Sequence, residues 1–122
     1  ELQKLILAES NISLYEYLGT LISKWNDKNN NIGLVAGATN IDDIKKLKTI
    51  CPKIPFLVPG IGSQGGDLES VLNILKQGNI DTSPYIINSS RSILYATDKL
   101  EFELAARIEA DKFVNLVKPL IF

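Results

Sequence analysis

Apolar residues recur at steps of three and four in four stretches of the chain, which is the spacing of amphipathic helices. These stretches cover residues 14–25, 40–50, 68–78 and about 98–117. In the last stretch, Leu104, Ala105 and Ile108 form the predicted inner stripe. Ser13 and Asn40 stand where they can cap the first two helices, because their side chains accept hydrogen bonds from unpaired N–H groups.

Three short apolar runs lie between these helices and predict strands. They are "IGLVAGAT" at 32–39, "FLVPG" at 56–60 and "PYIINSS" at 84–90. Each run is too continuously apolar for a strand with one face in water, so we expect strands covered on both faces. Helices and strands alternate with short connections, which predicts a parallel sheet with right-handed crossovers. The fold class is therefore α/β, either part of a TIM (β/α)8 barrel or a small doubly wound sheet.

The composition is that of a single globular unit, residues 1–122. Its 122 residues are 45% hydrophobic, which is enough for one core. Thirteen basic and 14 acidic residues give a net charge of -1, so the chain has no long-range field to gather nucleic acid or an anionic membrane. One cysteine and no bilayer-length apolar run predict a protein of the reducing cytoplasm.

Three loops that follow predicted strands are candidates for chemistry, because sites in parallel α/β folds collect where strands end. They are "GATN" after the first strand, "PGIGSQGGD" after the second and "NSSRS" after the third. In "PGIGSQGGD", the glycines at 60, 62 and 65 let backbone N–H groups converge on an anion, although they also fit a plain tight turn. Arg91 follows the next strand among three serines, and its guanidinium can hold phosphate oxygens bidentately. Together these last two loops predict a phosphate site. A dinucleotide site ranks second, because Arg91 stands near where such a site needs an acid.

Three segments, "GLVAGATN", "FLVPGIGSQGGD" and "YIINSSRSI", in this order and spacing resemble orotidine 5′-phosphate decarboxylase, in its longer bacterial-type subfamily. The resemblance covers nearly the whole chain and implies the last part of a (β/α)8 barrel, from helix five onward. It implies decarboxylation of orotidine 5′-phosphate to uridine 5′-phosphate, in de novo pyrimidine biosynthesis, without cofactor or metal. It also implies a homodimer.

The resemblance assigns roles to two groups of residues. The first group would bind the substrate phosphate: Gln64, Ser90 and Arg91. The second group would line the pyrimidine side or its loop: Pro59, Gly60, Gly62 and Thr39.

The lysine and aspartate array of this family, a "D-x-K"-type motif at the end of an earlier strand, has no counterpart here. The acid and lysine neighbours all lie in helix patterns: Asp43 with Lys45 and Lys46, Asp98 with Lys99, and Asp111 with Lys112. We interpret them as solvated helix faces. The resemblance therefore implies no catalytic residue in this chain and a complementary amino-terminal half that supplies the array.

Three parallel strands cannot close a barrel, so we expect open sheet edges and an exposed apolar inner face. The alternative function is a stand-alone phosphate- or nucleotide-binding module without catalysis. Two further residues have structural interpretations. Asp67 is placed to cap the helix at 68–78, with ligand contact as the other possibility, and Cys51 is expected to pack at a helix end without chemistry.

Overall fold

The computed structural model describes residues 2–62, 67–76, 84–97 and 101–121. Within these residues one sheet holds three parallel strands in the order β1 (Leu34–Val35), β2 (Phe56–Val58) and β3 (Tyr85–Ile87). The helical elements are η1 (Leu2–Lys4), α1 (Leu14–Asn29), α2 (Ile41–Ile50), α3 (Leu68–Lys76), α4 (Arg91–Leu94) and α5 (Phe102–Ile121). The predicted alternation of helices and strands is confirmed. Helix α4 is an additional element that the apolar patterns did not predict.

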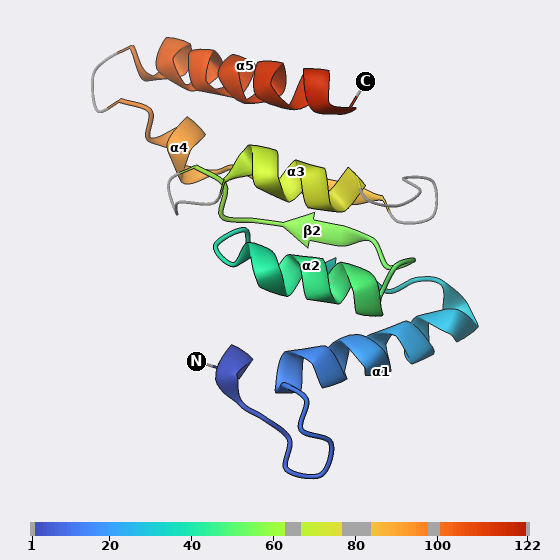
Figure 1. Cartoon of the computed structure of the whole chain (residues 1–122). Coiled ribbons are helices and arrows are strands. Elements are labelled where there is room, and N and C mark those ends of the chain that lie inside the picture. Colours follow the sequence, from blue (N-terminus) through green and yellow to red (C-terminus); the bar gives the residue numbers. More distant parts are fainter. Residues whose placement is uncertain (1, 63–66, 77–83, 98–100, 122) are drawn as a thin grey trace.

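The helices form a layer over one face of the sheet. In Figure 1, β2 is seen between α2 and α3, with α1 beyond α2 and α5 beyond α3. Helix α2 contacts α1 and α3, and α5 contacts α3 and α4. Strand register aligns Leu34, Phe56 and Tyr85 in a row that packs against the core beneath this layer. The largest fully buried side chains of this core are Phe56, Ile44, Ile54, Leu72, Leu75, Val58, Val71 and Cys51.

The opposite face of the sheet is apolar and open in the described part of the chain. Register aligns Val35, Leu57 and Ile86 in the next row, and their exposed fractions are 64%, 39% and 68%. Successive side chains of a strand point to opposite faces, and the helices cover only one of them. The expectation of strands covered on both faces is therefore wrong for this chain. The exposed inner face expected for three strands of a barrel is observed.

The starts of helices α1 and α2 differ in how they are capped. The Ser13 N–H donates to the Glu16 carboxylate over 3.0 Å, and the Ser13 hydroxyl donates to the same carboxylate. Asn40 occupies the cap position of α2, but its side-chain amide donates to the Asp43 carboxylate over 2.8 Å. Ser13 thus takes part in the predicted N-terminal cap, whereas Asn40 holds a side chain of the first turn instead of a backbone N–H.

Helix α5 packs through a different stripe from the predicted one. Leu104 and Ile108 are 57% and 45% exposed, while Phe113 packs against the core and Ala105 is half-buried. The prediction of Leu104 and Ile108 as inner residues is wrong, because small alanines beside Phe113 provide a second stripe that faces its neighbours. Helix α5 also extends beyond the predicted end at 117. Among the described residues, no helix combines the length and apolarity needed to cross a membrane.

Gly19 is the point of close approach between α1 and the end of α2. A Cβ at Gly19 would stand 3.0 Å from Leu47 Cδ2 and 3.3 Å from Cys51 Sγ. The Cys51 thiol also donates to the Gly19 carbonyl oxygen over 3.1 Å. The two helices therefore pack with no room for a side chain at this position.

Gly19→Val is expected to lower the free energy of unfolding by about 1–3 kcal/mol, because the added methyl groups overpack this contact. Urea denaturation followed by circular dichroism measures the change. Lys24→Val, on the exposed side of the same helix, introduces the same side chain without the contact. Equal losses in the two variants would contradict the close packing at Gly19.

Candidate functional site

Backbone hydrogen bonds that continue past the strands hold the three candidate loops together. The Ala38 N–H donates to the Pro59 carbonyl oxygen over 2.8 Å and links the turn after β1 to the glycine loop after β2. The Asn88 N–H donates to the Val58 carbonyl oxygen over 3.0 Å and links the end of β3 to β2. The loops predicted to carry chemistry therefore meet at the carboxyl ends of the strands.

The loop after β2 depends on glycine where it leaves the sheet. Gly60 has φ 96° and Gly62 has φ 79°, backbone conformations that residues with a Cβ rarely adopt. Between them, Ile61 is buried, and Pro59 is half-buried. Gln64 and Gly65 lie outside the described residues. The described part of the loop is thus a turn that is bonded to the segment after β1 at Pro59 and reaches Ser92 at Gly62.

Arg91 is the first residue of α4 and reaches solvent. The Ser90 carbonyl oxygen accepts the Leu94 N–H over 2.9 Å, and the Ser90 hydroxyl donates to Asn88 Oδ1 over 3.0 Å. Arg91 is exposed and makes no ion pair with any described residue. A free guanidinium at the start of a helical turn is suited to an anion. The sequence placed Arg91 after β3, but four residues are too few for an apolar period that would reveal α4.

A hydroxyl pair connects the end of β3 with α4. Ser89 Oγ and Ser92 Oγ lie 2.6 Å apart, and Ser92 also lies next to Gly62. Both serines and Gly62 border a cavity of about 280 Å³ whose other walls are mainly apolar side chains of α3, α4 and α5. In the sequence, Ser89 and Ser92 are two of the three serines around Arg91, and nothing in their spacing indicates that they touch.

Thr39 lies on the turn between β1 and α2. It is exposed and borders a separate cavity of about 290 Å³ between α1, β1 and α2, together with Tyr15 and Asp43. Its neighbour Ala38 makes the backbone bond to Pro59 described above. Thr39 is therefore one residue away from a direct link to the glycine loop.

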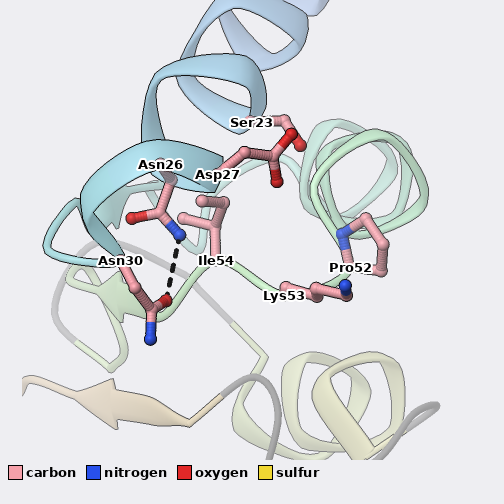
Figure 2. Close-up of a pocket in the computed structure, with 7 residues that line it drawn as sticks. All are labelled: Ser23, Asn26, Asp27, Asn30, Pro52, Lys53 and Ile54. Carbon is pink, nitrogen blue, oxygen red and sulfur yellow. Dashed lines mark hydrogen bonds between the residues drawn. The ribbon is translucent and has the colours of Figure 1, made fainter.

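The largest described cavity lies at the other end of the strands and has a structural role (Figure 2). It measures about 460 Å³ and is lined by Ser23, Asn26, Asp27, Asn30, Pro52, Lys53 and Ile54. The buried Asn26 amide donates to Asn30 Oδ1 over 3.3 Å, and its Oδ1 accepts the Ile32 N–H over 2.8 Å. These bonds fix the end of α1 to the segment that leads into β1, where parallel α/β folds carry stability and not chemistry.

No family model matches the chain. Over 97% of its length it is 41% identical to orotidine 5′-phosphate decarboxylase of Thermomicrobium roseum, and over 85% it is 46% identical to the protein of that name from Dehalococcoides mccartyi. The solved structure of Leishmania donovani OMP decarboxylase matches 98% of the chain with a TM-score of 0.72 and 29% identity. The chain is homologous to a carboxy-terminal portion of orotidine 5′-phosphate decarboxylase. It spans 41% and 37% of the length of the two curated relatives and 41% of the solved decarboxylase.

Homology to the decarboxylase decides between the two architectures that the sequence left open, part of a (β/α)8 barrel and a small doubly wound sheet. The structural neighbours are decarboxylases with a TIM barrel fold, so the three parallel strands with their flanking helices are part of a (β/α)8 barrel. The doubly wound sheet, and with it the dinucleotide-binding turn, is not supported. The carboxyl ends of β1, β2 and β3 accordingly lie on the face of the barrel where such enzymes carry their sites.

The acid and lysine neighbours considered in the sequence lie in helices α2 and α5 where the structure describes them. Between α1 and α2, Lys46 Nζ lies 3.5 Å from the Glu16 carboxylate, and Asp43 Oδ2 accepts the Asn40 side-chain amide over 2.8 Å. Burial, followed by the nearby Asp43 carboxylate, raises the pKa of the Tyr15 hydroxyl. In α5, Asp111 pairs with Arg107 over 3.9 Å, and Lys112 pairs with Glu109. Asp98 and Lys99 lie outside the described residues. Lys45, Lys46, Asp111 and Lys112 are exposed, as expected for solvated helix faces, whereas Asp43 is half-buried and borders the cavity beside Thr39.

Asp67 caps α3, as the sequence predicted. Its Oδ1 accepts the Glu69 N–H over 3.1 Å, and its Oδ2 accepts the Ser70 hydroxyl. The Ser70 hydrogen bond, followed by the backbone bonds, lowers the pKa of the Asp67 carboxyl below its usual value of 3.8. The side chain is thus engaged with its own helix directly after the glycine loop.

Cys51 also has the predicted structural role. It is fully buried at the end of α2, its thiol donates to Gly19, and burial raises its pKa. A thiol that burial keeps protonated is a poor nucleophile, so Cys51 contributes packing.

The lowered pKa of Asp67 predicts a pH-dependent contribution to stability. The charged cap is fully present above pH ~4 and is lost as the pH falls through the lowered pKa of the folded state. The difference in urea midpoint between the wild-type chain and Asp67→Asn should therefore be constant near neutrality and shrink in acid. Ser70→Ala should raise the Asp67 pKa toward its usual value in an NMR titration. An Asp67 pKa at or above 3.8 in the wild-type chain would contradict the cap.

Proposed function

We propose that this chain supplies the phosphate-binding part of the active site of an orotidine 5′-phosphate decarboxylase. The complete barrel would convert orotidine 5′-phosphate to uridine 5′-phosphate in pyrimidine biosynthesis. The observation that carries the proposal is the position of Arg91. In a chain homologous to this enzyme, Arg91 is the first residue of α4 after β3, is exposed and has no ion pair with a described residue. The next residue, Ser92, lies against Gly62 of the loop after β2.

The proposed phosphate grip has three parts. Arg91 would supply a charged clamp, and the backbone around Ser90 would supply N–H donors. Gln64, which lies outside the described residues, is the third proposed contact. No hydrogen bond of the Arg91 or Ser92 N–H groups to a described residue competes with this role. Charge-assisted bonds to phosphate are among the strongest that a protein forms, so these parts suffice without a strong overall charge.

The proposed pyrimidine side uses the beginning of the same loop. Pro59, Gly60 and Gly62 would line it, because the turn brings their backbone to the carboxyl ends of the strands without side chains that project into the site. Thr39 would complete this wall from the turn after β1, since the Ala38 to Pro59 bond holds that turn against the loop.

The proton-transfer groups of the reaction are proposed to lie in the part of the barrel to which this chain does not correspond. Binding energy from the phosphate, remote from the reacting carbon, would then hold the site closed and dry around a carbanion-like transition state. The chain alone would grip phosphate without catalysing decarboxylation.

A complementary amino-terminal half is proposed to cover the open sheet face. The row of Val35, Leu57 and Ile86 is apolar and exposed, as the inner face of an unclosed barrel would be. We extend the proposal to a homodimer, which the family resemblance supports. We also propose a cytoplasmic location, which is supported by the single, free and buried cysteine.

Arg91→Ala in the complete barrel is expected to raise KM for orotidine 5′-phosphate about 10²-fold, because bonds between charged groups and phosphate are lost. Steady-state kinetics measure KM, and urea denaturation should show little change. Arg107→Ala removes an exposed arginine of α5 whose only described ion pair is with Asp111, and its KM should stay at the wild-type value. Unchanged kinetics in Arg91→Ala would refute the assignment.

Ile86→Glu tests the proposed barrel closure. A carboxylate on the inner face should destabilise the complete barrel by several kcal/mol, since a buried charge without a partner is costly. In this chain alone the same residue faces solvent, so the change should have little effect on its stability. Comparable urea midpoints of wild-type and Ile86→Glu barrels would contradict coverage of this face.

A further inference from the structure

The two sides of the proposed phosphate grip come from different strands, so their relative position must be set by contacts between the loops. The bond from Asn88 N–H to the Val58 carbonyl joins β3 to β2 before either loop turns away. Beyond it, Gly62 faces Ser92: a Cβ at Gly62 would lie 3.4 Å from Ser92 Oγ and 3.6 Å from Ser92 Cβ. Ser92 therefore stands against the glycine loop with a space about one methyl group wide between them.

Arg91 itself has few contacts that would orient it. Its side chain is exposed and has no ion pair among the described residues, so the backbone of α4 sets the point from which the side chain starts. That helix is a single turn, and isolated turns of helix are unstable on their own. An additional constraint on the first turn is therefore needed.

The hydroxyl pair of Ser89 and Ser92 supplies this constraint. The two oxygens lie 2.6 Å apart and bridge the chain across Ser90 and Arg91. Both side chains are half-buried beside a cavity lined mainly by apolar residues, with the Glu109 and Lys112 ion pair as its charged part. The bridge joins the end of β3 to α4, and Ser92 also borders the glycine loop.

We propose that Ser89 and Ser92 are positioning residues, whose hydroxyl pair holds Arg91 at the correct distance from the glycine loop for phosphate binding. This inference rests on the proposed function. Neither serine needs to touch the substrate, because both act through the backbone of α4. Loss of either hydroxyl should leave the Arg91 side chain present and charged but displaced from its binding position.

The test uses Ser89→Ala, Ser92→Ala and the double variant in the complete barrel. Each single variant should raise KM for orotidine 5′-phosphate about tenfold, since small misplacements of a binding group are costly. The double variant should be no worse than the singles, because the two hydroxyls form one interaction. Turnover of orotidine, which lacks the phosphate, should be unchanged. Ser23→Ala, at the opposite end of the strands, is the matched control and should resemble wild type.

Arg91→Ala, measured in parallel, separates the possible failures. If KM rises in Arg91→Ala but in neither serine variant, the positioning role is refuted and the phosphate grip stands. If KM is unchanged in Arg91→Ala, the proposed function and this inference both fail. Two outcomes would overturn the inference: additive increases of KM in the double variant, or an equal loss of activity with orotidine. Either would show that the hydroxyl pair only stabilises the fold in general. Should one single variant not fold, the other removes the same hydrogen bond and decides the test.

Discussion

The parallel pairing of β2 with a strand on each side is the constraint on which the rest of the structure depends. It aligns the strands so that Phe56 lies in one row with Leu34 and Tyr85, while Leu57 lies in the next. The same pairing continues beyond the strands as backbone bonds into the loops. Because these bonds fix where each loop leaves the sheet, short strands suffice to bring the glycine loop and the segment that carries Arg91 to the same edge of the sheet.

One-sided coverage is the second consequence of this pairing. The helices cover the row that contains Phe56, and the row that contains Leu57 remains open in the described part. Burying an apolar side chain of this kind contributes about 1.5–3 kcal/mol. Coverage of three such residues would therefore add an amount comparable with a large part of the stability of an ordinary domain. Homology to a portion of a barrel enzyme accounts for the open face, since the remaining strands of such a barrel would lie there.

The sequence was sufficient for features that local chemistry determines. The charge order and spacing at 40–50 predicted α2, and Asp67 was correctly placed as a cap. Two glycines of the predicted glycine loop, Gly60 and Gly62, have positive φ angles. Features that depend on neighbours were less predictable. A continuous apolar strand does not show which face is covered, and a helix with two apolar stripes, such as α5, does not show which one packs. The contact of Ser89 with Ser92 requires the turn of α4, which has no apolar period.

In the proposed function, Arg91 and the glycine loop together bind the substrate phosphate. A crystal structure of the complete barrel with uridine 5′-phosphate is the decisive measurement. We expect the phosphate between the loop at 59–62 and the start of α4, with oxygens within hydrogen-bond distance of the Arg91 guanidinium and the backbone at Ser90. A phosphate bound at another place in the barrel, with Arg91 directed to solvent, would refute this role.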